Sequence, residues 1–182
     1  MPKKPAANTI QITSGRLRRR IIKTPANSTT HPMGARERLA LFNIIAPLGA
    51  LDNVLDAFAG SGALGIEALS RGARNAVFVE QDHTAAHTIR ENIKALDLED
   101  ITSVLEKPVE KLSLNGRYTL VIADPPYDNY NPQIIEHLLP LVDKNGIFVL
   151  SHPGQITPLL NGFRLLKHTS YANANISVFQ KL

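Results

Sequence analysis

Short apolar runs and helically spaced apolar positions alternate along most of this chain. The runs typical of buried strands cover residues 53–58, 75–80, 101–105, 118–123 and 146–151. Helical spacing appears ahead of and between these runs, over residues 35–46, 63–71, 83–96 and 132–142. Strand, helix and strand in succession imply parallel strands joined by right-handed crossovers, so a ligand should bind at the carboxyl ends of the strands.

The end of the chain departs from this alternation. Residues 163–168 and 176–180 are apolar-containing runs that can pair as an antiparallel hairpin. With the five earlier strands, they predict an α/β fold built on a doubly wound, mostly parallel seven-stranded sheet. The length of 182 residues and the hydrophobic content of 43% suit one compact domain with a core of its own.

The positive charge of the chain is concentrated at its N-terminus. Residues 1–38 contain nine Lys or Arg against one acidic residue, whereas residues 39–182 contain eleven against fifteen. Two apolar-containing runs flank a Ser-Gly break in this region, so we expect a hairpin-like basic arm over residues 1–30 and the main domain over 31–182. The side chains expected to contact the phosphates of a polyanion are Arg16, Arg18, Arg19, Arg20 and Lys23. The plainer alternative is a solvated basic tail.

Residue types and segments that the sequence lacks limit the bonds, metal sites and cellular location that we expect. The chain has no cysteine, which excludes disulfides and thiolate metal sites and permits a reducing cytoplasm. No apolar segment follows Lys3 and Lys4, so we expect a cytoplasmic protein without a secretory signal or membrane span. The six histidines share no ligand spacing with an acidic cluster, and we expect no metal site. Only His152, at a strand end, could lie near a ligand.

A glycine-rich turn separates the strand at 53–58 from the helix that follows. Gly60, Gly62 and Gly65 allow a tight turn, close backbone approach and close packing of the helix on the strand. The next strand ends at Glu80, where an acidic side chain can accept both hydroxyls of a ribose. A lone glycine pattern could be a plain turn, but this combination favours a nucleoside-bearing cofactor. The spacing also fits a dinucleotide, although no chain is left for the substrate domain that NAD enzymes normally carry.

The most specific feature is the run Asp124-Pro125-Pro126-Tyr127 at the end of the apolar stretch 118–123. Two successive prolines remove two backbone donors, which leaves the Asp124 carboxylate and nearby carbonyls as hydrogen-bond acceptors only. Such an array suits an NH2 group, and the flat ring of Tyr127 suits the nucleobase that carries it. An isolated run of this kind would be explained more simply as an Asp-Pro turn that closes a strand.

Together, these two motifs resemble those of S-adenosylmethionine-dependent methyltransferases that modify an exocyclic base amine. The resemblance implies that S-adenosylmethionine is the cofactor, that Glu80 holds its ribose and that residues 124–127 hold the base. It also implies that the methionine part of the cofactor lies against Asp56, Phe58, Gly60, Ser61 and Gly62, and that Asp124 contacts the cofactor as well as the base.

The order of basic arm, helix, glycine loop and Asp124 motif is similar to that of the bacterial ribosomal RNA small-subunit methyltransferase D family, over nearly the whole chain. That resemblance implies a Rossmann-like methyltransferase that modifies N2 of one guanine in 16S rRNA, with this RNA or the small ribosomal subunit as its partner. We expect a monomer. Two segments depart from the family: His31 to Ala35 replace the usual Arg-Pro-Thr, and Val109 stands in the adenine pocket expected at 106–109. Val109 would therefore contact adenine through its backbone.

At the Asp124 motif we expect catalysis to consist mainly of positioning the target amine against the methyl group of the cofactor. The Asp124 carboxylate and the Pro125 carbonyl would accept the two amine hydrogens of guanine and aim its lone pair at the methyl group, while Tyr127 stacks on the extruded base. Residues 128–130 would form a mobile edge of the pocket or a solvated loop. The same array accepts any aromatic amine, so adenine-N6 methylation of DNA or RNA is an alternative. A third hypothesis is a nucleic-acid-binding module that has lost catalysis. The presence of both Asp124 and Glu80 argues against it.

Overall fold

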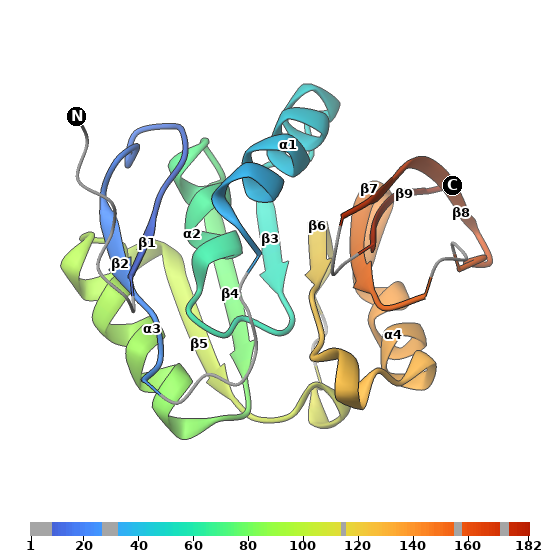
Figure 1. Ribbon diagram of the computed structural model, residues 1–182. Coiled ribbons are helices and arrows are strands. Elements are labelled where there is room, and N and C mark those ends of the chain that lie inside the picture. Colours follow the sequence, from blue (N-terminus) through green and yellow to red (C-terminus); the bar gives the residue numbers. More distant parts are fainter. Residues whose placement is uncertain (1–8, 27–32, 114–115, 155–157, 172–174) are drawn as a thin grey trace.

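The computed structural model of the chain describes residues 9–26, 33–113, 116–154, 158–171 and 175–182 (Figure 1). Seven strands form one sheet in the order β5-β4-β3-β6-β7-β9-β8. The first five are parallel, β9 is antiparallel to β7, and β8 is antiparallel to β9. Their bounds are β3 Asn53–Asp56, β4 Asn75–Glu80, β5 Thr102–Glu106, β6 Tyr118–Ala123, β7 Val142–His152, β8 Phe163–Ser170 and β9 Asn175–Lys181. The predicted mostly parallel sheet with a C-terminal hairpin is confirmed.

The four α-helices within the described residues lie where helical spacing predicts them. They are α1 Ala35–Ile45, α2 Ala63–Ser70, α3 His83–Ala95 and α4 Pro132–Leu138. The fourth is shorter than predicted because a 3-10 turn containing Pro140 follows it at Leu139–Leu141. Strand β7 then begins at Val142, four residues earlier than the apolar run, through a polar stretch in which Asn145 has a φ of 62°.

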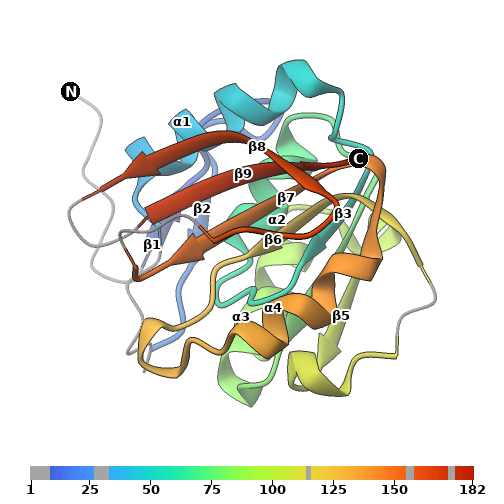
Figure 2. The same ribbon diagram turned by 90° about the vertical axis from the view of Figure 1, so that its right-hand side faces the viewer.

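Helices cover both faces of the sheet, and the strands alternate their side chains between them. Val54 and Ile122 point into the core under α1, α2 and α3, whereas Leu55 and Val121 point into the core under α4. Figure 2 shows α1 and α4 on opposite sides of the strands β7, β9 and β8. All four of these strand side chains are fully buried, which fixes the register of β3 and β6 in the middle of the sheet.

Strand order reverses between β3 and β6. From β3 the chain proceeds outward to β4 and β5 on one side, and from β6 to β7 on the other. The loops after β3 and β6 therefore leave the sheet in opposite directions and open a crevice at the carboxyl edge, which is where open α/β sheets bind ligands.

The basic N-terminal segment forms a hairpin that packs on the body of the protein. Strands β1 Thr9–Gln11 and β2 Ile21–Lys23 pair antiparallel beside α2 and α3 (Figure 1). Four apolar side chains of this segment are buried in the same core as α1, α2 and α3, namely Ile10, Ile12, Leu17 and Ile22. The boundary at residue 30 stays a prediction, but the described part of the arm is anchored by apolar burial.

The tip of this hairpin, residues 13–17, is fixed to the last turn of α2. The Arg16 N–H donates to the Ser70 carbonyl (2.7 Å), and the Leu17 N–H donates to the Ser70 hydroxyl oxygen (2.9 Å). Gly15 has a φ of +81°, and a Cβ there would lie 1.9 Å from the Ser70 carbonyl oxygen. Only glycine therefore permits this approach.

Glu67 of α2 is the second anchor of the hairpin tip. Its carboxylate is fully buried and accepts hydrogen bonds from the Thr13 N–H (2.9 Å), the Thr13 hydroxyl (2.6 Å) and the Ser14 N–H (3.1 Å). Arg71, one turn further along α2, adds a charged donor at 2.9 Å. These donors satisfy a charge that would otherwise be costly to bury.

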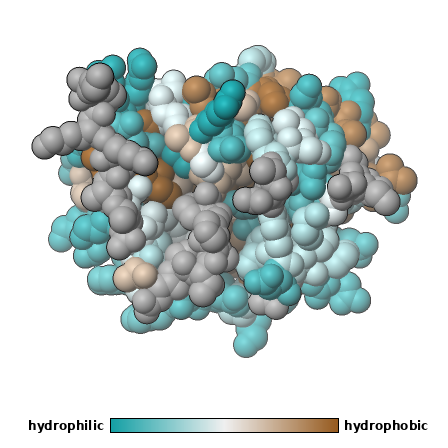
Figure 3. Space-filling view, in the orientation of Figure 1, coloured by the Kyte–Doolittle hydropathy of each residue, from teal (hydrophilic) through white to brown (hydrophobic). Residues whose placement is uncertain are grey.

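The described surface is largely polar on the face seen in Figure 3, where hydrophobic residues form small separate areas. Among the helices that the structure describes, none has the length and apolar character needed to cross a membrane.

Candidate functional site

Five polar side chains lie in a row along the carboxyl edge of the sheet. They end successive strands or follow them directly: Glu106 on β5, Glu80 on β4, Asp56 on β3, Asp124 after β6 and Ser151 on β7. Because neighbouring parallel strands bring their carboxyl ends together, Asp56 and Asp124 become neighbours although 68 positions separate them in sequence. The middle three, which sequence analysis singled out, flank the reversal point of the sheet.

The glycine loop after β3 is held by backbone bonds to the strands on either side. The Ala57 N–H donates to the Ile122 carbonyl (2.9 Å), and the Ala59 N–H donates to the Val79 carbonyl (3.0 Å). Gly60 has a φ of +54°, and a Cβ built there would meet no atom within 4 Å, so the loop leaves open space at that point. A Cβ on Gly65 would instead lie 2.3 Å from the Phe78 ring, which shows that this glycine lets α2 pack tightly on β4.

Asp56 is the most electrostatically strained group of the site. It is fully buried, its Oδ2 accepts the Gly65 N–H (2.9 Å), and its Oδ1 has no hydrogen-bond partner among the described residues. Burial raises the pKa of Asp56 to about 7; the Gly65 bond opposes that rise, and the charges of Asp124 and Glu80 add to it. A buried carboxyl surrounded by further carboxylates is a site that favours a cation.

Glu80 braces the glycine loop and keeps acceptor capacity to spare. Its Oε2 accepts the Gly60 N–H (2.8 Å), and its Oε1 accepts the Asp82 N–H (2.9 Å). A carboxylate can accept about four hydrogen bonds, so roughly two positions remain for hydroxyl groups. This arrangement agrees with the predicted role at a ribose, a role that stays a proposal.

Asp124, Ser151 and Tyr127 form a hydrogen-bonded chain at the other end of the row. The Tyr127 hydroxyl lies 2.6 Å from the Ser151 hydroxyl oxygen, and Ser151 in turn hydrogen-bonds the Asp124 side chain. Burial raises the pKa of Asp124, and the Ser151 bond counteracts this. When Asp124 is ionised it can only accept, so in that state Ser151 donates to Asp124 and accepts from Tyr127.

The two prolines and the residues after them shape the same corner. Pro125 is buried, and Pro126 leads into a 3-10 turn at Tyr127–Asn129. Tyr130 packs partly buried against the core under α4, so its ring supports this edge of the pocket. Neither proline has an N–H to offer, which keeps the corner rich in acceptors as predicted from the sequence.

The remaining predicted cofactor residues occupy different surroundings. Ser61 is buried and its carbonyl accepts a bond from Asn92 Nδ2 (3.0 Å), while Phe58 packs half-buried against the core under α4. Val109 begins a short 3-10 turn after β5, and its side chain is buried in that same core. This burial leaves the backbone as the part of Val109 that a ligand could reach, and the expected contact with adenine stays a prediction.

His152, the histidine that the sequence suggests could lie near a ligand, contacts side chains of β8 and β9 instead of the acidic row. His152 Nε2 is 3.1 Å from the Ser177 hydroxyl oxygen, which is also 3.0 Å from His168 Nδ1. Burial lowers the pKa of His152, with His168 contributing in the same direction. Within the ranges given above, no three His, Asp or Glu side chains are grouped so that they could hold a metal ion. His31 and Pro32 of the segment that departs from the family lie outside the described residues.

The predicted nucleic-acid-binding side chains are not part of the acidic row. Arg16, Arg18, Arg19, Arg20 and Lys23 are all exposed on the hairpin. The hairpin tip contacts Ser70 at the end of α2, whereas the glycine loop precedes Ala63 at its start. The eight residues of α2 thus separate the two regions by about 12 Å.

Ser151 is the functional side chain that sequence reasoning missed. It is 1% exposed and bridges two residues of the Asp124 motif from the neighbouring strand. The available signal was its place at the carboxyl end of the strand next to β6, because a small polar residue that ends a buried strand there can reach the same crevice.

Comparisons with known proteins are consistent with this geometry. Residues 10–180 match the family model described as Conserved hypothetical protein 95. The ribosomal RNA small subunit methyltransferase D of Escherichia coli K12 is 32% identical over 146 residues, which cover 80% of this chain and 72% of that protein. A solved structure of a hypothetical protein from Thermus thermophilus has a TM-score of 0.79 and 30% identity, and it covers 93% of this chain and 98% of the other. A shorter match, 33% identical over 92 residues, is to a tRNA1(Val) (adenine(37)-N6)-methyltransferase of Shewanella putrefaciens and covers 48% of this chain and 39% of that protein.

Proposed function

This chain belongs to the ribosomal RNA small subunit methyltransferase D family, and on that premise we propose that it transfers a methyl group from S-adenosylmethionine to the N2 amine of a guanine in 16S rRNA. The observation that carries the proposal is the acidic row that ends in the Asp124–Ser151–Tyr127 chain. It combines an environment suited to a cationic cofactor with an acceptor array suited to an amine.

The charge of the row favours this cofactor over a dinucleotide. The charged groups that act on buried Asp56 are the carboxylates of Asp124 and Glu80. A pyrophosphate would be repelled there, whereas a sulfonium and an ammonium group would be attracted. When bound, S-adenosylmethionine supplies an electrophilic methyl group on its sulfonium sulfur.

The residues of the chain would contribute orientation and exclusion of water. Asp124, held by Ser151, and the Pro125 carbonyl accept the two hydrogens of the target amine, which directs its lone pair toward the methyl group. Tyr127 is fixed through its hydroxyl, so its ring offers a defined surface for the unstacked base.

Adenine N6 is the second candidate acceptor, because Asp124 accepts from any aromatic amine and because part of the chain matches an adenine-N6 methyltransferase. The deciding experiment incubates the protein and labelled S-adenosylmethionine with small ribosomal subunits, free 16S rRNA or duplex DNA, followed by mass spectrometry of the nucleosides. We expect label in N2-methylguanosine from rRNA, made by a cytoplasmic monomer. Label in N6-methyladenosine alone would replace guanine with adenine as the acceptor.

The affinity for S-adenosylmethionine should depend on pH through Asp56. Its pKa of about 7 means that a proton must leave before a full negative charge faces the cofactor, so affinity should rise with pH by up to about tenfold per unit below pH 7 and level off above it. Calorimetry from pH 5.5 to 8.5 measures this. The variant Asp56→Asn carries no such proton and serves as the control. Parallel profiles for the two proteins would contradict the placement of Asp56 beside the cofactor.

Replacing Glu80 should weaken cofactor binding without unfolding the protein. Glu80→Ala removes the acceptors proposed for the ribose and also frees the Gly60 N–H, so we expect a loss of roughly 1 to 3 kcal/mol in binding free energy. Calorimetry on the folded variant checks this. The variant Glu80→Gln keeps one acceptor oxygen, so its affinity for S-adenosylmethionine should lie between that of the wild type and that of Glu80→Ala. Unchanged affinity in Glu80→Ala would remove this side chain from the site.

A further inference from the structure

We infer that the groove between the basic hairpin and α1 binds the RNA backbone, with phosphates contacted by Arg18 and Arg19 on the hairpin and by Arg36 on α1. This inference rests on the proposed function, since it names the surface that holds the RNA whose base enters the Asp124 pocket. It adds Arg36 to the predicted contacts and separates the hairpin cations into two groups.

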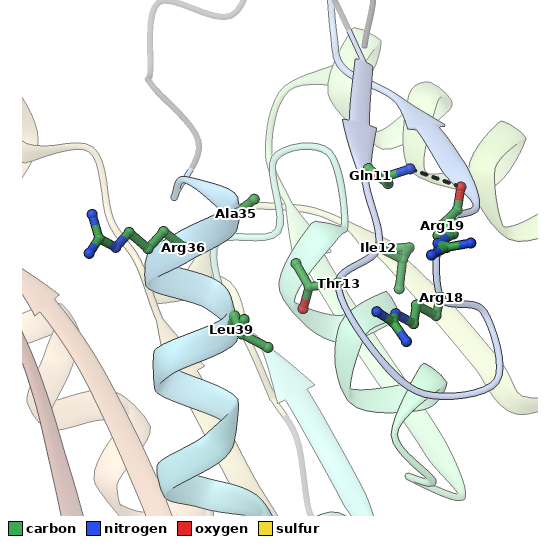
Figure 4. Close-up of a pocket in the computed structure, with 8 residues that line it drawn as sticks. All are labelled: Gln11, Ile12, Thr13, Arg18, Arg19, Ala35, Arg36 and Leu39. Carbon is green, nitrogen blue, oxygen red and sulfur yellow. Dashed lines mark hydrogen bonds between the residues drawn. The ribbon is translucent and has the colours of Figure 1, made fainter. Parts of the chain in front are cut away.

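The groove is a defined feature with two walls. It has a volume of about 360 Å³ and lies between residues 11–13 and 18–19 of the hairpin and the first turn of α1. Figure 4 shows Arg18 extending from the hairpin toward α1, and Ala35 and Leu39 facing the hairpin from α1. Arg36 leaves α1 on its far side, so a strand that lies in the groove and continues across the start of α1 would pass all three arginines.

The spacing of the walls is fixed by a buried arginine. Arg38 of α1 is 2% exposed and donates from Nη1 to the Met33 carbonyl (2.6 Å) and from Nη2 to the Gln11 carbonyl (2.9 Å). The second bond ties α1 directly to strand β1. The groove therefore exists before any ligand arrives, which reduces the entropy lost on binding.

Side-chain partners distinguish the cations of the groove from Arg20 and Lys23 on the same hairpin. Arg18, Arg19 and Arg36 are exposed, and none forms an ion pair with an acidic side chain in the described part of the chain. Arg16 also forms no ion pair within the described residues, but it does not line the groove. In contrast, Lys23 Nζ lies 3.2 Å from Glu91 Oε2, and Arg20 Nη2 donates to the Ala95 carbonyl (3.0 Å). Cations without partners are the ones that can bind phosphates without first breaking a bond.

The local charge of the groove and the apolar side chains of its α1 wall suit a nucleic-acid strand. Glu37 is the one acidic residue among the first 38, and its carboxylate folds back over Gly34, where an added Cβ would lie 2.2 Å from Oε2. Leu39, 41% exposed, and Ala35 give the α1 wall apolar surface against which a base or sugar can pack. Charge complementarity therefore favours RNA over a protein ligand at this groove.

The test compares two triple variants that remove the same charge from opposite sides of the hairpin. Arg18→Ala, Arg19→Ala and Arg36→Ala together alter the groove, and Arg20→Ala, Lys23→Ala and Lys94→Ala together alter the α3 side, where Lys94 is exposed. Filter binding of 16S rRNA is measured over a salt series, with S-adenosylmethionine affinity and thermal unfolding as checks of integrity. Truncating the hairpin is unsuitable because Ile12 and Ile22 are part of the core.

We expect the groove variant to raise the RNA dissociation constant by about tenfold or more and to reduce the salt slope by roughly 2 to 3, with cofactor affinity unchanged. Methylation should show a raised KM and a kept kcat. The α3-side variant should raise the RNA dissociation constant by a smaller factor than the groove variant, because Arg20 and Lys23 already have partners within the protein. Equal losses in both variants, or no loss in the groove variant while the wild type binds and methylates rRNA, would overturn the inference and leave the proposed function standing. Weaker binding to assembled subunits but unchanged binding to free rRNA would assign the groove to a protein ligand instead. A wild-type protein that neither binds nor methylates rRNA would refute the proposed function itself.

Discussion

Asp124→Ala should lower the turnover of methyl transfer by about two orders of magnitude or more, while affinity for S-adenosylmethionine is largely kept. The reason is that Asp124 is proposed to contact the amine that attacks, and its acceptor geometry matters most in the transition state. Single-turnover methylation of small ribosomal subunits at saturating cofactor measures the chemical step. Calorimetry on the same variant shows whether the cofactor still binds.

Ser151→Ala is the matched variant for this experiment. It keeps the Asp124 carboxylate but removes the hydroxyl that orients it and that accepts from Tyr127 at 2.6 Å, so turnover should fall by less than in Asp124→Ala. The pKa of Asp124 should also rise, because the bond from Ser151 that lowers it is lost, and the pH profile of turnover should move upward. Near wild-type turnover in Asp124→Ala would refute the acceptor-array mechanism.

Glu67→Ala should destabilise the fold by about 3 to 5 kcal/mol. The substitution leaves the Thr13 and Ser14 N–H groups and the Nε of the nearly buried Arg71 without the carboxylate that accepts from them, at the point where the hairpin joins α2. Urea unfolding monitored by circular dichroism measures the change. Glu67→Gln retains one acceptor oxygen and should destabilise less.

A charge-matched control for that experiment is Glu91→Ala. Glu91 pairs with Lys23 across an exposed surface, where both side chains are more than 40% accessible, so its loss should change stability by about 1 kcal/mol or less. If Glu67→Ala and Glu91→Ala lowered the free energy of unfolding by the same small amount, the hairpin would be held by apolar packing rather than by Glu67.

The sheet and most of the acidic row could be predicted because each depends on local patterns. The apolar runs predicted over 53–58, 75–80 and 118–123 correspond to strands that end at Asp56, Glu80 and Ala123, each with a polar group at or directly after its end, and strand-helix alternation brings those ends together. The glycines of the loop carry their own conformational signal. The comparisons confirm the family resemblance drawn from these motifs.

The features that the sequence did not reveal depend on pairs of residues far apart in the chain. Glu67 belongs to a short helix whose polar and small residues are all buried, and its partners lie 53 and 54 residues earlier. Ser151 on β7 contacts Tyr127, which follows the neighbouring strand β6 and lies 24 residues earlier in the sequence. Neither has a local pattern that differs from an ordinary helix or strand residue. The docking of the hairpin also rests on Gly15, whose role becomes visible only beside Ser70.

The acidic row that surrounds Asp56 has a consequence for release of the product. In the proposed site, Asp56, Glu80 and Asp124 would attract a sulfonium cation through its positive charge, and methyl transfer would leave an uncharged thioether in the same place. The row would then hold the spent cofactor less tightly than the fresh one, and the unpaired Asp56 could take up a proton again. In this way the same three carboxylates would favour the exchange of product for substrate between successive turnovers.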